Sequence, residues 1–226
     1  MNIIFLIITL TLIAALAIGG IYFLYQVLMN YHPSKRKVQS DLRKTREEIQ
    51  PWINELIPWK ADELNLLSLN QVNRAFKKGI VTTMKGVFTS IYQEPMVTYA
   101  YRRYFSPQED ALLYARTAHR EFVYRIKKGE VMISIDQQLV GVVRENGKLY
   151  RVKSSQLLAQ IDRDKDELML PITIKDREVA GLIKPQHAMN VNARAFEFVS
   201  EMPEEEEALL LSLSILELVK NDLPSK

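Results

Sequence analysis

The sequence predicts a mainly β protein with some α: an N-terminal transmembrane helix, then an antiparallel closed β-barrel that encloses a hydrophobic C-terminal helix. Three observations predict it: an uncharged apolar run at the N-terminus, a middle region of short β-type runs, and a second apolar run near the C-terminus. We therefore divide the chain into a transmembrane anchor (1–29), a basic juxtamembrane and helical connector (30–78), and a barrel with a buried C-terminal helix (79–226).

The anchor is predicted from 23 consecutive residues without a charge, residues 3–25. As a helix they extend roughly 35 Å, enough to cross a hydrocarbon core with some tilt. The alternative is a cleaved signal peptide, for which Ala15 and Ala17 offer a cleavage triplet. Against it, no Lys or Arg precedes the run, and the apolar stretch continues through Met29.

Basic residues follow the span closely, whereas the short N-terminal side has none. The positive-inside rule therefore predicts a single-pass protein of the cell membrane, with its N-terminus outside and its C-terminal domain cytoplasmic. The bilayer is its first predicted partner, and the same residues could contact anionic lipid headgroups; the alternative is that they are only a topology signal. The cluster comprises Lys35, Arg36, Lys37, Arg43, Lys44 and Arg46.

The connector is predicted to be helical. Apolar residues between Val38 and Leu56 recur at spacings of three and four, which is one face of a helix, and Pro51 is expected to kink or restart it. A second short helix is predicted over 62–78, with Asp62 as its N-cap and Gly79 as the terminating residue.

After Gly79 the helical spacing gives way to short runs rich in Val, Ile, Tyr, Phe and Thr, each ended by a turn signal. Almost no helix is expected between them, so the sheet is predicted to be antiparallel. The clearest hairpin has Asn146 and Gly147, which favour a type I′ turn. The eleven predicted strands are 80–88, 96–104, 112–118, 121–127, 130–135, 139–144, 148–152, 156–161, 167–174, 178–183 and 195–199.

The last helix is predicted from Pro203 and the four glutamates 204–207, which suit a helix start. Residues 208–219 follow with Glu217 as their only charge. This run is shorter than the about 20 apolar residues that cross a bilayer, and it is apolar on nearly every side, so it must be buried in protein. A barrel around the helix is favoured over an open sheet with the helix on one face, which leaves half the helix exposed.

The hairpins VMISIDQQLVGVVRENGKLYRV and LPITIKDREVAGLIKP, followed by RAFEFVSEMPEEEEALLLSLSILELV, resemble the tubby, LURP-one and phospholipid-scramblase superfamily. The resemblance covers about 79–223 and implies a barrel around a terminal hydrophobic helix, with phosphoinositide or lipid association and tethering as themes. No diagnostic motif of that superfamily is matched, so no site residue is transferred. The segment KGVFTSIYQEPMVTYAYRRY is also similar to bacterial single-span membrane proteins of no assigned activity, which implies a location only.

Motifs for catalysis, cofactors and metals are absent from the sequence. There is no G-x-S-x-G, H-E-x-x-H, P-loop or G-x-G-x-x-G, and no Cys; the three histidines, at 32, 119 and 187, lie in different segments. The acidic stretch 162–173 begins like an EF-hand loop but has Glu167 at the glycine position and Thr173 at the bidentate-ligand position. No catalytic residue, cofactor or metal site is therefore predicted.

A second basic group, Arg102, Arg103, Lys127 and Lys128, is a possible surface for lipid or for an acidic partner. The stretch YAYRRYF alternates as a strand does, and a tethered domain rarely meets nucleic acid, so no nucleic-acid partner is expected. The predicted function is a membrane-tethered cytoplasmic binding or scaffolding module, without catalysis, that recruits an unknown protein partner or senses the lipid surface. The alternative is an enzyme acting on membrane lipid or envelope precursors.

Overall fold

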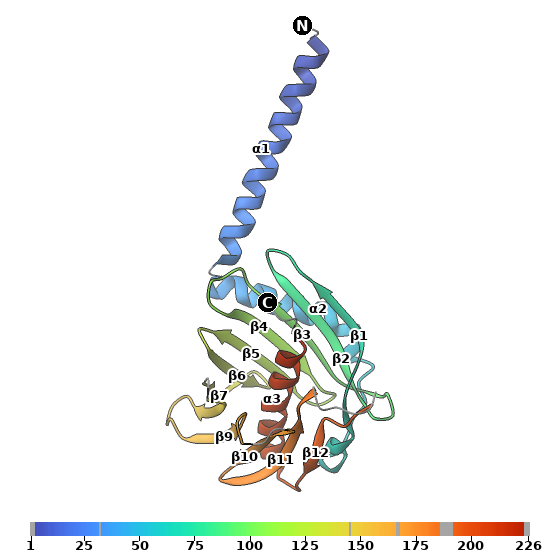
Figure 1. The fold of residues 1–226 in the computed structure, drawn as a ribbon. Helices are drawn as coiled ribbons and strands as arrows, with labels where there is room; N and C mark the ends of the chain where they lie inside the picture. The colour runs from blue at the N-terminus through green and yellow to red at the C-terminus, as the bar shows by residue number, and fades with distance from the viewer. Residues whose placement is uncertain (1–2, 32, 145, 166–167, 186–191, 224–226) are drawn as a thin grey trace.

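The computed structural model describes residues 3–31, 33–144, 146–165, 168–185 and 192–223 (Figure 1). Within them the protein is mainly β, with three α-helices, one short 3-10 helix and twelve strands. The strands form one antiparallel sheet whose spatial order follows the chain from β1 to β12. The sheet curls into a nearly closed barrel, which bears out the mainly β class, and an apolar helix projects from one end.

The helices are α1 (Ile3–Tyr31), α2 (Lys35–Ile53), η1 (Ala61–Leu66) and α3 (Glu204–Asn221). The strands are β1 (Leu67–Lys77), β2 (Thr82–Ser90), β3 (Pro95–Arg103), β4 (Asp110–Arg116), β5 (Glu121–Lys127), β6 (Glu130–Ile135), β7 (Gln138–Val143), β8 (Lys148–Arg151), β9 (Leu157–Ile161), β10 (Met169–Ile174), β11 (Arg177–Ile183) and β12 (Phe196–Val199).

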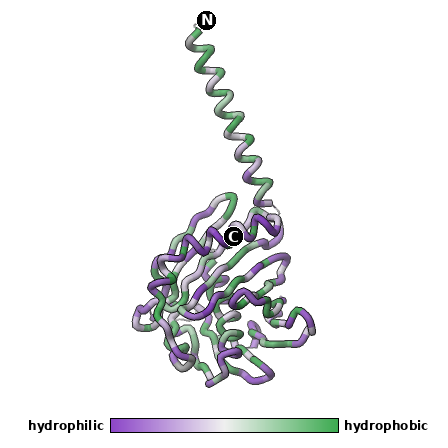
Figure 2. Tube along the Cα trace, turned by 180° about the vertical axis from the view of Figure 1, so that it is seen from behind, coloured by the Kyte–Doolittle hydropathy of each residue, from purple (hydrophilic) through white to green (hydrophobic). Residues whose placement is uncertain are grey.

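Helix α1 is mostly apolar and stands away from the barrel (Figure 2). Its segment Phe5–Tyr31, 27 residues, is long and apolar enough to cross a membrane, and none of its most hydrophobic window is buried by protein. A membrane span and a signal sequence both meet this description. In water such a surface is unfavourable by roughly 25 cal/mol per Å² of apolar area.

The barrel nearly closes between its first and last strands. Ser68 of β1 bridges Arg194, which precedes β12. Leu69 donates its backbone N–H to the carbonyl of Ala193 at 2.9 Å, and Ala195 donates to the carbonyl of Leu67 at 2.7 Å. These bonds join only the beginning of β1 to the last strand region, so the seam is held at one end of the barrel.

The helix predicted over 62–78 is wrong. Residues of η1 form a single 3-10 segment, and the chain then enters β1, so the sheet begins at Leu67. Two register shifts interrupt the pairing of β1 with β2, one between Leu67 and Gln71 and one between Val72 and Ala75. Bulges of this kind break the two-residue alternation of a strand, which is why the apolar spacing imitates a helix.

The hairpin between β7 and β8 also differs from its prediction. Arg144 donates its N–H to the Lys148 carbonyl at 3.2 Å, and Gly147 donates its N–H to the Arg144 carbonyl at 2.9 Å. Gly147, at φ +76°, therefore closes the turn as its left-handed residue. The type I′ turn centred on Asn146 and Gly147 is wrong, and a longer loop with a glycine bulge takes its place.

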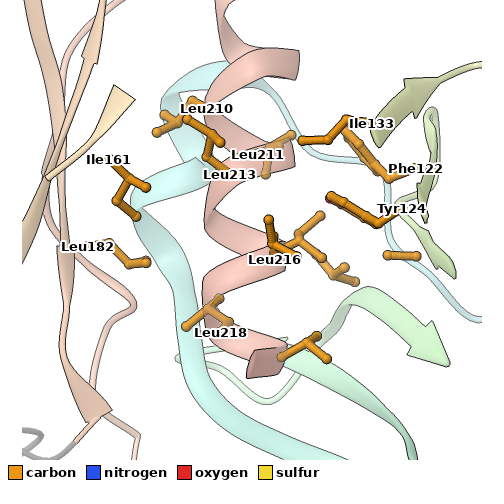
Figure 3. Close-up of a cluster of buried hydrophobic side chains, with 14 of the residues drawn as sticks. Phe122, Tyr124, Ile133, Ile161, Leu182, Leu210, Leu211, Leu213, Leu216 and Leu218 are labelled. Carbon is orange, nitrogen blue, oxygen red and sulfur yellow. The ribbon is translucent and has the colours of Figure 1, made fainter. Parts of the chain in front are cut away.

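Helix α3 is buried on nearly all sides and packs against β6, β9, β10 and β11. Figure 3 shows Leu210 and Leu218 toward Ile161 and Leu182, while Leu211 extends toward Ile133 on the other side. Burial of a leucine side chain contributes about 1.5–3 kcal/mol, so this contact is a large part of the core. The buried residues are Glu206, Ala208, Leu210, Leu211, Ser212, Leu213, Ser214, Ile215, Leu216, Glu217, Leu218 and Val219.

Candidate functional site

The end of the barrel that adjoins α1 is fixed by an aromatic contact. The ring of Tyr31, the last residue of α1, lies 6.3 Å from the ring of Phe105, in the connection between β3 and β4. Asn30 is only 3% exposed although most of the helix is exposed. Pro33 is also buried, and Ser34 caps α2 by accepting a hydrogen bond from the Lys37 N–H. Little free chain therefore separates the apolar helix from the barrel.

Helix α2 lies on the outer face of β3 and β4. Asp41, Thr45 and Ile49, four residues apart, form its buried face, and Ile49 packs against Ala100 and Tyr114. The spacing follows from the helical repeat, in which every fourth residue returns to the same side. The helix expected between Val38 and Leu56 is present as α2, which includes Pro51 and ends at Ile53 (Figure 1).

Asp41 anchors the first half of α2. Its carboxylate, 1% exposed, accepts hydrogen bonds from Lys37 Nζ at 2.6 Å and from the Tyr104 hydroxyl at 3.1 Å. Burial, and then the charge of Asp41, raise the pKa of Tyr104, so this hydroxyl keeps its proton and remains a donor. The guanidinium of Arg125 lies over the Tyr104 ring and pairs with Asp110 at 2.5 Å.

Glu121 anchors the second half of α2. Its carboxylate lies 2.5 Å from Arg46 and 3.6 Å from Arg116, and it accepts a hydrogen bond from Tyr114 at 3.1 Å. Burial alone lowers the pKa of Arg46, but the hydrogen bond and charge of Glu121 outweigh it, and the pKa is raised. Arg46 is therefore a permanent cation that joins α2 to β5.

The six predicted membrane-surface residues are not all available to lipid. Lys37 and Arg46 turn toward the barrel and pair with Asp41 and Glu121. The other four are exposed and form no ion pair with any residue that the structure describes. These four are Lys35, Arg36, Arg43 and Lys44.

The second predicted group lies at the same end of the barrel. Arg103 is opposite Ala111 across β3 and β4, and Lys127 is opposite Asp110 across β4 and β5. Lys127 and Lys128 are exposed. Arg102 is the exception: its side chain is 18% exposed and approaches Glu48 of α2 at 3.7 Å, so it faces the helix. We call Lys35, Arg36, Arg43, Lys44, Arg103, Lys127 and Lys128 the basic rim.

A groove of about 490 Å³ runs between α2 and the hairpin of β1 and β2. Lys77, Lys85 and Arg102 line it with Glu48 as the one carboxylate, and Phe76 is among its apolar residues. Lys85 also lies over the Trp52 ring at 5.2 Å. The sequence reasoning missed Lys77 because it falls in the strand that was taken for a helix. Lys85 lies in a strand that was predicted, but its position beside α2 depends on packing that no local pattern indicates.

The opposite end of the barrel has exposed charges of both signs. Exposed carboxylates lie in its turns and at the start of α3: Glu94, Asp136, Asp176, Glu201, Glu204 and Glu205. Exposed cations lie at the same end: Arg151, Lys153, Lys175 and Arg177. Arg120 joins two of the carboxylates, at 3.1 Å from Asp136 and 2.6 Å from Glu204. Two hollows, of about 740 and 340 Å³, flank this arginine.

The described part of the chain contains no cluster of three or more His, Cys, Asp or Glu side chains placed to hold an ion. His119 lies in the smaller hollow with Glu207 and Trp59. His32 and His187 lie outside the described residues.

Comparisons with known proteins found no match, so the function is argued from the structure alone. No protein-family model matches the chain, and neither a curated protein nor a solved structure matches it.

Proposed function

We propose that this chain is a single-span, membrane-tethered binding or scaffolding module that acts without catalysis at the cytoplasmic face of the cell membrane. Its barrel lies with the basic rim against the lipid headgroups and its opposite end toward the cytoplasm. The observation that supports this arrangement best is the joint at Tyr31 and Phe105, because it places the basic rim beside the end of the apolar helix.

Electrostatics favour this placement. Each basic residue near an anionic bilayer surface contributes about 1 kcal/mol of attraction, and the effect fades within a Debye length of roughly 8–10 Å. The basic rim has seven such residues. Phe105, 49% exposed, adds an aromatic ring of the kind that prefers the interface between headgroups and hydrocarbon.

A barrel whose interior is filled by a helix favours binding on its outer surfaces. We infer that the barrel encloses α3, since leucines on different sides of the helix extend toward different parts of the sheet (Figure 3). Such a core has little room for a substrate. The three hollows described above lie on the outside of the barrel or at the end opposite the basic rim. Small-molecule sites need about 300–1,000 Å³ of concave space with converging polar groups.

A fixed α2 suits a scaffold. Two buried carboxylates, Asp41 and Glu121, hold this helix on β3, β4 and β5. Because α2 begins directly after α1, a rigid α2 sets the position of the barrel relative to the bilayer. A freely hinged linker in its place would leave the barrel to tumble away from the surface.

Orientation is tested by labelling, since the chain has no native Cys. Ile3→Cys and Ser154→Cys, both exposed, are expressed separately in cells and treated with a maleimide that does not cross membranes. We expect Ile3→Cys to react in intact cells and Ser154→Cys only after permeabilisation. The reverse pattern, or loss of the segment before Ser34 from the mature protein, contradicts the proposal.

Contact with lipid is tested on the full chain in nanodiscs. Phe105→Cys and, as a matched control at the opposite end, Tyr92→Cys are labelled with an environment-sensitive dye. A blue shift for position 105 that grows with anionic lipid, and none for position 92, supports the proposal. Equal spectra at both positions contradict it, and turnover of lipid by the purified chain contradicts a role without catalysis.

A further inference from the structure

We propose that the barrel end remote from α1 binds an extended peptide segment of a partner protein, one in which a large apolar residue stands beside acidic residues. The site is the 740 Å³ hollow next to the N-terminal end of α3, lined in part by Leu139, Val152 and Leu209. This goes beyond the membrane role proposed above and does not depend on it.

The barrel wall is interrupted at this hollow. Strand β8 has only four residues, and β7 pairs with it only from Gly141 to Val143. Gln138, Leu139 and Val140 of β7 therefore have no neighbouring strand on that side among the described residues. An extended peptide can add to such an edge through main-chain hydrogen bonds, with pockets for alternate side chains giving specificity.

The connection from β8 to β9 does not cover the free edge. Arg151 donates its N–H to the Gln156 carbonyl at 2.8 Å, and Ser155 donates to the Arg151 carbonyl at 3.0 Å. The loop thus satisfies its own backbone groups and leaves those of Leu139 and Val140 without a partner from it.

Apolar side chains surround the opening. Leu139 is 53% exposed and Val152 is 48% exposed, and both line the hollow with the half-buried Val140, Leu158 and Leu209. Its volume falls within the range of ligand sites, and an apolar anchor in a pocket is the usual centre of a peptide interface. A large apolar side chain of the partner fits this lining.

The charges around the hollow favour particular residues on either side of the partner's apolar anchor. Arg151 and Lys153 are exposed and have no carboxylate partner among the described residues. Three cations, Arg120, Arg151 and Lys153, and two carboxylates, Asp136 and Glu205, line the hollow, and Arg120 also pairs with Glu204 outside this lining. The lining therefore has an excess of one positive charge, which attracts acidic residues beside the apolar anchor more than basic residues.

To test this proposal, a display library of random peptides is selected for binding to the full chain in nanodiscs. The nanodiscs contain only neutral lipid, so that the selection is independent of any contact with anionic lipid. We expect enriched peptides with a large apolar residue next to Asp or Glu. Synthetic copies should bind about tenfold or more weakly to Leu139→Asp, while Tyr92→Asp, an exposed site outside the hollow, binds them unchanged.

Two further measurements separate this site from non-specific binding. The double variant Arg151→Glu with Lys153→Glu should enrich basic in place of acidic flanks, and peptides N-methylated at alternate amides should lose binding because strand addition needs their N–H groups. Enrichment without an apolar–acidic pattern, binding that survives Leu139→Asp, or no enrichment at all overturns the proposal. Melting temperatures close to that of the unsubstituted chain confirm that the variants fold.

Discussion

Arg163 and Glu217 form an ion pair that joins the connection between β9 and β10 to the C-terminal part of α3, with Arg163 Nη2 2.8 Å from Glu217 Oε2. Glu217 is the only charged residue between Ala208 and Val219, and its side chain is 9% exposed. The carboxylate is therefore held in the core region by a cation from a distant loop.

Removing one partner should cost more stability than removing both. Arg163→Ala leaves the buried Glu217 carboxylate without its guanidinium, and we expect a loss of about 1–3 kcal/mol in the free energy of unfolding. Arg163→Met combined with Glu217→Met should recover most of that loss. Urea unfolding of the full chain in detergent micelles, followed by the fluorescence of Trp52 and Trp59, measures both; equal losses for the single and the double variant contradict the prediction.

Truncation of a leucine on α3 should destabilise the barrel strongly. Leu213 is 1% exposed, and Leu213→Ala should lower the free energy of unfolding by about 2–5 kcal/mol through lost contacts and a cavity. Leu139→Ala, at a position that is 53% exposed, is the matched control and should cost less than about 0.5 kcal/mol. Similar values for the two variants would show that α3 is not part of the core.

Glu206 and Glu207 should respond to pH in opposite directions. The hydrogen bond from Lys175 lowers the pKa of Glu206; burial opposes it, and Arg177 adds to the lowering. A lowered pKa in the folded state stabilises the protein above the unfolded value of about 4.3, and this stability is lost as pH falls through the folded pKa. Glu206→Gln should therefore destabilise at pH 7 and have little effect at strongly acidic pH.

Burial raises the pKa of Glu207; Arg120 opposes this and Glu204 adds to it. Here the sign is reversed: the stabilising contribution is complete below the unfolded pKa and is lost as pH rises through the folded pKa. Glu207→Gln should consequently stabilise the chain at pH 7 and lose this advantage near pH 4. Melting temperatures of both variants across this range check the pair, and parallel pH profiles contradict it.

The bond between Tyr104 and Asp41 should govern how firmly α2 is held. Tyr104→Phe and Asp41→Asn each weaken a hydrogen bond to a buried charge, with a coupling energy of about 1–2 kcal/mol in a double-mutant cycle. Hydrogen exchange should quicken in α2 and remain slow in β10 and β11. Unchanged exchange in α2 means that packing at Ile49 is sufficient to hold the helix.

Local patterns predicted much of the barrel. The bounds of β5 and β6 agree with the alternation of apolar and polar residues, because these two strands pair with each other without a register shift. Strand β1 was missed for the opposite reason: its bulges remove the alternation, and Asn73 adopts a positive φ of 54°. Single-residue insertions of this kind depend on the partner strand and leave no fixed period in the sequence.

The candidate site was predictable only where partners are close in the chain. Lys37 and Asp41 are four residues apart, so their ion pair follows from helical spacing. Arg46 meets Glu121 across 75 positions of the chain, and no periodicity indicates such a pair. For that reason the sequence assigned Arg46 to the membrane surface although it belongs to the contact between α2 and β5.

The short connection between α1 and α2, at Pro33 and Ser34, also limits the distance of the barrel from the end of α1. Strand β3 has nine residues, so the barrel is roughly 30 Å deep along its strands. With α1 in the bilayer, the hollow beside Leu139 would stand at about that height. A membrane-bound partner would then need a stalk of some nine or ten extended residues to arrive there, whereas a partner that diffuses in solution would need none.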